Sequence, residues 1–148
     1  MEDKGKLAFL FFNEIGIINQ LASALFNKKL PDGLHVSHFS VLNHMMRMGD
    51  GRTPATLASA MQVTKATMTH TLSALAKRDL IVIEPHASDG RSKVVRLTPA
   101  GRTFHAEAIG SLFPAIAALD EAVDWESLEN LIPELQRVRA ILDNNRDL

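Results

Sequence analysis

Apolar side chains recur every three or four residues along most of the chain, a spacing typical of helices. Two short strands, at about 80–84 and 93–97, interrupt this pattern. Pro114 is expected to bend one helix, and Pro133 either kinks the last helix or marks its start. The pattern predicts a mainly α fold with one small β-hairpin, and helices at about 4–29, 36–48, 53–61, 64–78, 99–119 and 124–145.

Two threonines mark the starts of the third and fourth helices. Thr53 precedes Pro54, which is favoured at a first helical position because no backbone N–H is needed there. Thr64 follows the short turn Gln62-Val63. Two short helices joined by so tight a turn indicate a helix-turn-helix, and a hairpin directly after the second helix indicates a wing.

The helix at 64–78 has a narrow apolar stripe and a wide polar face. Met68, Leu72 and Leu75 form the stripe. An exposed face without acids suits phosphates and base edges, although an ordinary solvated face is the alternative interpretation. No acid precedes Asp79 on this helix, whose polar side chains are Lys65, Thr67, Thr69, His70, Ser73 and Lys77.

The loop between the strands, PHASDGRS, has a cationic tip. Arg91 can enter a minor groove, whose negative potential attracts guanidinium groups. Asp89 is expected to hold this guanidinium or a neighbouring one, and Gly90 gives the tip conformational freedom. A solvated loop charge is the alternative.

The net charge of −1 conceals a strongly uneven distribution of charge. Residues 52–102 hold eight Lys and Arg against three acids, whereas residues 103–148 hold three against nine. A basic middle predicts contact with a polyanion. The absence of Cys excludes disulfides, thiol nucleophiles and thiol redox switches, and makes a cytoplasmic location the expectation.

Residues 7–26 form an apolar run of nearly membrane-spanning length. Asn13, Glu14, Asn19 and Gln20 interrupt this run, and acids cancel the basic charge before it. We therefore expect a helix buried on more than one side, neither a signal peptide nor a membrane anchor. Because this helix and the last one carry more apolar surface than a small domain can cover, the sequence predicts a homodimer.

The segments GLHVSHFSVL and TPATLASAMQVTKATMTHTLSALAKRDLIVIEPHASDGRSKVVRLTPAG resemble the MarR (multiple antibiotic resistance regulator) family of winged-helix transcription factors. The most specific signal is Asp89-x-Arg91 followed by Leu97-Thr98-x-x-Gly101, and the resemblance covers essentially the whole chain. It implies one domain over 1–148, with a winged helix-turn-helix at about 34–101 and dimerisation helices at 1–30 and 102–148. Such proteins are obligate dimers whose terminal helices intertwine, and many release DNA when a small ligand binds.

Two positions depart from the family pattern. Asp79 replaces the glycine that usually follows the recognition helix, a position that favours a left-handed backbone. His70 stands where an arginine is common. Arginine reads guanine with two hydrogen bonds and histidine does not, so the operator sequence is expected to differ.

The sequence thus predicts a sequence-specific regulator of transcription, a homodimeric repressor on palindromic double-stranded DNA that a ligand relieves. A winged-helix protein–protein adaptor is the alternative from another class. No serine lies in a strand–elbow–helix context, so we predict no enzyme, no catalytic residue and no cofactor. The predicted DNA-binding residues are Thr53, Thr64, Lys65, Thr67, Thr69, His70, Ser73, Asp89, Arg91 and Lys93.

Six histidines raise the question of a metal, and His35, His38 and His44 share one predicted helical region. Without Cys or a nearby acidic cluster we predict no metal site, which leaves a metal-sensing member of the same family as a third reading. A cavity between the first, second and fifth helices could admit an aromatic or phenolic effector. Its predicted lining residues, which are also ordinary core candidates, are Asn13, Ile17, His35, His38 and Met46.

Overall fold

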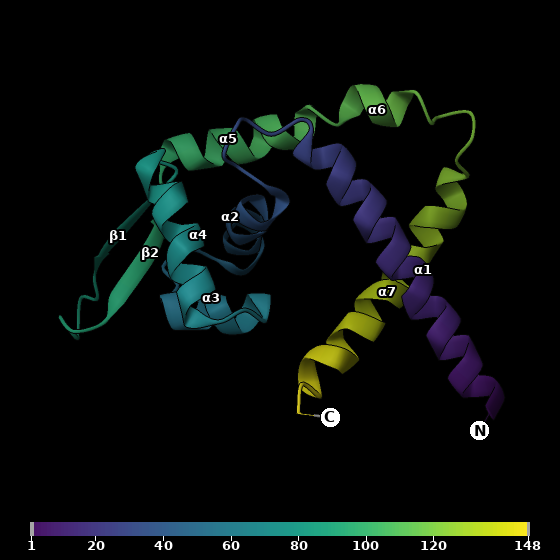
Figure 1. Cartoon of the computed structure of the whole chain (residues 1–148), viewed down its shortest axis with the longest axis horizontal. Helices are drawn as coiled ribbons and strands as arrows, with labels where there is room; N and C mark the ends of the chain where they lie inside the picture. Colours follow the sequence, from purple (N-terminus) through teal and green to yellow (C-terminus); the bar gives the residue numbers. More distant parts are fainter. Residues whose placement is uncertain (1, 148) are drawn as a thin grey trace. The chain divides into compact units, whose positions relative to one another are not determined.

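The computed structural model describes residues 2–147, which form helices and one two-stranded sheet (Figure 1). The helices before the sheet are α1 (Glu2–Asn27), α2 (Val36–Met48), α3 (Pro54–Met61) and α4 (Lys65–Lys77). The strands are β1 (Ile81–Pro85) and β2 (Lys93–Leu97). The helices α5 (Pro99–Gly110), α6 (Phe113–Ala117) and α7 (Trp125–Asn144) follow. The prediction of a mainly α chain with a β-hairpin wing is confirmed.

Hydroxyl caps begin three of these helices where the sequence predicted a start. The Thr53 hydroxyl accepts a hydrogen bond from the Thr56 amide at 3.1 Å, and Thr64 accepts one from the Thr67 amide at 3.1 Å. The Thr98 hydroxyl does the same for the Gly101 amide at 2.9 Å. Each cap satisfies an amide that has no partner inside its own helix, which fixes where the helix begins.

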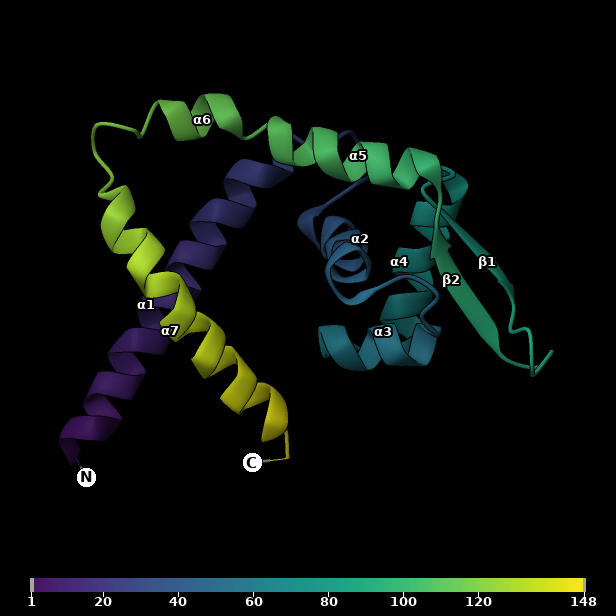
Figure 2. The same cartoon turned by 180° about the vertical axis from the view of Figure 1, so that it is seen from behind.

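A buried cluster joins α2, α3, α4 and the sheet into one core. Leu42, Leu57 and Leu75 are fully buried in it, and Met68 and Leu72 of α4 lie there as the sequence predicted. Figure 2 shows these three helices and the two strands gathered behind α5. The narrow apolar stripe of α4 therefore faces the core, and its polar face is left to solvent.

The hairpin is antiparallel, with Ile81 opposite Leu97 and Pro85 opposite Lys93. The backbone of Arg52 adds a short third strand, because it exchanges hydrogen bonds with Val95 at 3.2 and 2.7 Å. This pairing attaches the loop before α3 to the edge of the wing.

Two residues explain why the chain turns sharply on both sides of the sheet. Asp79 has a φ of 56°, the left-handed conformation expected at this helix end. A Cβ at Gly101 would overlap the carbonyl oxygen of Leu80, so only glycine lets α5 start against the end of β1's approach. The Leu97-Thr98-x-x-Gly101 sequence thus serves as a helix cap and a close-packing site.

The long helix predicted at 99–119 is wrong, because α5 ends at Gly110 and the separate helix α6 begins at Phe113. The ring of Pro114 clashes with the carbonyl four residues earlier, which is that of Gly110, and proline has no amide to donate. The break coincides with a division of the chain into two compact units between Leu112 and Phe113. Pro133 does not start α7, which begins at Trp125 and continues through it.

Helix α1 does not meet the expectation of burial on several sides within a single chain. Only Phe26 is buried among the residues of α1 that the structure describes, whereas Leu7, Phe9 and Leu21 are each more than two-thirds exposed. By length and composition this helix could also cross a membrane. Its apolar surface therefore needs a cover that the single chain does not supply.

Candidate nucleic-acid interface

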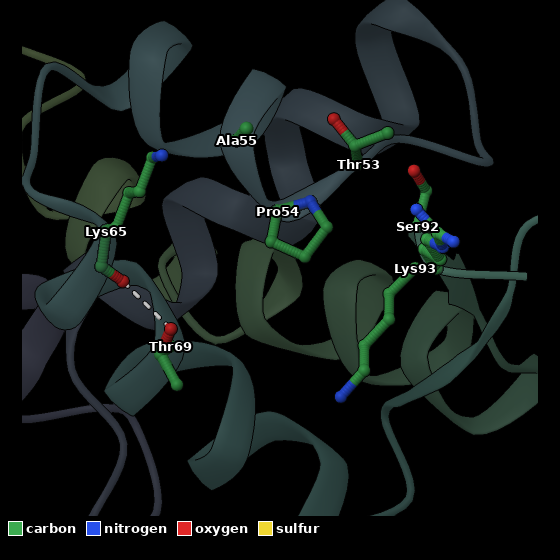
Figure 3. Close-up of a pocket in the computed structure, with 8 residues that line it drawn as sticks. Thr53, Pro54, Ala55, Lys65, Thr69, Ser92 and Lys93 are labelled. Atoms are coloured by element: carbon green, nitrogen blue, oxygen red, sulfur yellow. Dashed lines mark hydrogen bonds between the residues drawn. The ribbon is translucent and has the colours of Figure 1, made fainter. Parts of the chain in front are cut away.

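An open pocket of about 410 Å³ lies between α3, α4 and the wing (Figure 3). Five of the ten predicted DNA-binding residues line it, and Pro54, Ala55 and Ser92 complete the lining. The eight residues include three cations and no acid. The five predicted residues are Thr53, Lys65, Thr69, Arg91 and Lys93.

The cations come from two different elements of the fold. Lys65 is the first residue of α4, and Lys93 is the first residue of β2. Figure 3 shows these two side chains on opposite sides of Pro54, which begins α3. Because the N-terminus of a helix carries partial positive charge, the start of α3 adds to the attraction for an anion between the cations.

The hydroxyls of this region are held in defined positions. The Thr69 hydroxyl donates to the carbonyl of Lys65 at 2.9 Å, so its free lone pairs point away from the helix (Figure 3). The Thr64 hydroxyl donates to the hydroxyl of Thr67 at 3.0 Å. Side chains whose rotamers are already fixed lose little entropy when they meet a ligand.

The wing tip is fixed differently from our prediction. The Asp89 carboxylate accepts hydrogen bonds from the Arg91 backbone amide at 3.0 Å and from the Ser92 hydroxyl at 3.1 Å. These bonds lower the pKa of Asp89. The carboxylate is two residues from Arg91, close enough to close a tight turn on the backbone, so it shapes the tip instead of holding the guanidinium.

The remaining predicted side chains of α4 are exposed but lie outside the pocket. Thr64, Thr67, His70 and Ser73 are all accessible to solvent. His70 lies close enough to His38 of α2 for its charge to help lower the pKa of His38, and burial is the main cause of that shift. His70 therefore occupies the side of α4 toward the start of α2.

Sequence reasoning missed Pro54, Ala55 and Ser92 as lining residues. The signal for the first two was present, since Thr53-Pro54 already marked a helix start and hence an N-terminal anion site. Ser92 is placed by its own bond to Asp89. No local sequence signal indicates that this loop residue meets the start of α3.

Comparison with known proteins adds to this geometry. The sequence profile of the MarR family matches residues 32–92. The HTH-type transcriptional regulator YdgG of Bacillus subtilis strain 168 is 31% identical over 81 residues, which are 53% of each chain. The match thus spans about half the length of this curated relative.

Solved structures match over much more of the chain. The transcriptional regulator BldR of Sulfolobus solfataricus has 26% identity and a TM-score of 0.72, over 90% of this chain and 98% of BldR. CouR of Rhodococcus jostii RHA1, solved with p-coumaroyl-CoA bound, shares the fold with 23% identity, a TM-score of 0.66 and coverage of 84% and 87%. The chain belongs to the MarR family. Its family and these structural neighbours consist of transcriptional regulators, not enzymes.

The effector pocket predicted for this MarR-family chain is not assembled in the pockets described. His35 lines a second open pocket of about 250 Å³ beside the α1–α2 loop, and the other four predicted residues line neither pocket. Asn13 and Ile17 are exposed on α1, and Met46 is exposed on α2. His38 is buried, and its Nδ1 accepts a hydrogen bond from the His35 amide at 2.9 Å.

Histidines of this chain do not gather as metal ligands do. Among residues 2–147, no group of three or more His, Asp or Glu side chains could hold a metal ion. His105 instead stacks on Phe39, with ring centroids 5.1 Å apart, and its Nε2 lies 3.0 Å from the Asn43 side-chain oxygen. Burial lowers the pKa of His105, so its neutral form is favoured in this aromatic contact.

Proposed function

We propose that this MarR-family chain is a regulator of transcription that binds double-stranded DNA in a sequence-specific way. The observation that carries the proposal is the acid-free pocket of Lys65, Arg91 and Lys93 at the start of α3. Three cations around a helix N-terminus suit one segment of a phosphate backbone. The capped start of α4 beside this pocket then lies where its exposed polar face meets base edges.

The two kinds of contact have different roles in this proposal. Arg91 and Lys93 anchor the wing on the backbone, and the side chains of α4 specify the site. Thr67, Thr69 and His70 are short or uncharged enough to discriminate bases by hydrogen bonding. Ser73 continues the same helix toward its C-terminus.

A homodimer completes the proposed DNA-binding unit. The exposed apolar residues of α1 and α7 would be covered by a second copy, as the sequence of the terminal helices predicted. A two-fold axis then places two α4 helices about one helical turn of DNA apart, which requires an inverted-repeat operator. A soluble, cytoplasmic dimer also accounts for the apolar length of α1 without a membrane.

Relief of repression by an aromatic or phenolic ligand is the regulatory part of the proposal. CouR, which has the same fold, was solved with p-coumaroyl-CoA. In this chain Asn13, Ile17, His35, His38 and Met46 remain the residues we propose for such a ligand. Because linkage requires different affinities for two states, a ligand that raises the melting temperature must also lower DNA affinity.

The test of the proposed function uses genomic fragments retained by the purified protein, sequenced and then made as labelled duplexes. Arg91→Ala should weaken binding to all these duplexes by a similar factor, about 1–2 kcal/mol for one lost charged contact. Lys6→Ala is the matched control, because Lys6 is an exposed cation on α1 outside the pocket. Unchanged affinity in the Arg91 variant would contradict the role of the wing.

Two other functions are outcomes of the same experiment. A protein–protein adaptor would retain no specific fragments and would bind duplex DNA no better than any acidic polymer. A metal-sensing regulator would bind its fragments only after zinc is added.

A further inference from the structure

The short loop between α2 and α3 holds one acid that contacts two distant parts of the fold. Asp50 stands between Gly49 and Gly51, whose φ angles of 104° and 73° are in the range that favours glycine. The Asp50 Oδ1 accepts hydrogen bonds from the amide of Gly51 at 2.8 Å and from the amide of Leu97 at 2.9 Å. Leu97 is the last residue of β2, the strand that begins with the pocket residue Lys93.

The second carboxylate oxygen reaches a helix outside the wing. Asp50 Oδ2 lies 3.3 Å from Arg102 Nη2, in the first turn of α5. The Arg102 Nη1 also lies 3.4 Å from the sulfur of Met46 in α2. One side chain thus joins the end of α2, the end of β2 and the start of α5.

The residues on either side of Asp50 strengthen this connection. Arg52 pairs with Val95 of β2 through its backbone. Arg96 pairs with Glu84 of β1, and its guanidinium lies so close to Gly51 that a Cβ there would come within 2.9 Å of it. The next residue along the chain is Thr53, which caps α3 and lines the cationic pocket.

We propose that Asp50 is the positioning residue of the wing. Its carboxylate fixes the root of β2 against the start of α3, so that Arg91 and Lys93 stand at a set separation from Lys65. Through Arg102 it ties this separation to α5, and a displacement of α5 would move the wing cations relative to α4. Asp50 acts on DNA only through the wing, and this inference rests on the proposed function.

The test begins with Asp50→Ala in the full-length protein without DNA. Loss of the bond to the Leu97 amide should speed hydrogen exchange of peptides covering residues 93–98 by roughly threefold to tenfold. Asp32→Ala is the matched control, because it removes the same charge from another exposed loop of the same unit. Exchange in Asp50→Ala equal to that in the control would overturn the proposal, whether or not the protein binds DNA.

The second arm measures affinity for the duplexes retained by the wild-type protein. Removal of an acid should, by charge alone, strengthen binding to a polyanion, so weaker binding by Asp50→Ala points to position. The loss should be roughly threefold to tenfold, and less than about twofold in an Arg91→Ala background, because both changes act through the wing. Fully additive losses, or stronger binding, would contradict a positioning role.

Two further variants keep the inference testable if Asp50→Ala does not fold. Asp50→Asn keeps an oxygen for the Leu97 amide and loses the charge toward Arg102, and Arg102→Gln removes the other partner of that pair. Each should speed exchange at 93–98 less than Asp50→Ala would, and together no more than either alone. If neither variant changes exchange, α5 is not tied to the wing.

Discussion

The winged-helix region and helix α1 use apolar residues in opposite ways. In α4 the apolar side chains Met68, Leu72 and Leu75 are almost completely buried. In α1 large apolar side chains are exposed on several sides, and Phe26 alone is buried among the described residues. An apolar stripe that matches one face of a helix is satisfied within the chain, whereas apolar residues around a helix require a second molecule.

The first prediction removes the proposed cover of α1. Leu10→Glu together with Ile18→Glu should abolish the dimer, since burial of each side chain is worth about 1.5–3 kcal/mol. Both residues are more than half exposed in the single chain. Sedimentation velocity over a range of concentrations measures the loss, with Gln20→Glu on the same helix as the control. A variant that remains dimeric would place the interface elsewhere.

The second prediction concerns the core that needs no partner. Leu72→Ala should lower the free energy of unfolding by about 2–5 kcal/mol, because a fully buried leucine leaves a cavity. Urea titration measures this loss, which should be the same in the intact protein and in the Leu10→Glu, Ile18→Glu background. A loss confined to the dimeric protein would mean that the winged-helix core depends on the interface.

The third prediction separates the two kinds of DNA contact. His70→Ala should change which half-site is preferred, with a smaller change in affinity for random duplex. Arg91→Ala should leave the preference unchanged. Selection of half-sites from a randomised duplex library by each variant provides the comparison, and equal site preferences for wild type and His70→Ala would remove His70 from the base-reading surface.

The sequence predicted the elements of the winged-helix region because their signals are local. Thr53-Pro54 and Thr64 mark helix starts within a few residues, and these starts agree with the structure. Asp89 was given the wrong partner, since a pattern shows neighbours but not which atoms meet. Asp50 was not predicted at all, because its partners Leu97 and Arg102 lie 47 and 52 residues away.

The same contrast explains the failure beyond α5. Pro114 was recognised as a bend, but the clash with Gly110 adds to the weak helix preference of glycine, and together they end the helix. Pro133 is tolerated inside α7. The structure gives no local reason for this difference beyond the glycine.

The smallest expected effect is on stability at mildly acidic pH. Burial lowers the pKa of His38 below 6.5, so the folded protein binds fewer protons than the unfolded chain. The free energy of unfolding should therefore fall as the pH drops from 7 through 6.5 and below, and His105 contributes with the same sign. The urea midpoint at pH 7.5 and 5.5 measures this loss, and His38→Gln should reduce it. A midpoint that rises on acidification would contradict the neutral, hydrogen-bonded state of His38.

The salt dependence of binding to duplex DNA tests the central claim most directly. Lys65, Arg91 and Lys93 in each of two protomers predict a slope of about −5 in a plot of log affinity against log salt concentration. Arg91→Ala should make this slope shallower by about 2, one phosphate contact for each protomer. An affinity that does not change between low and physiological salt would contradict the proposal that the cationic pocket binds the DNA backbone.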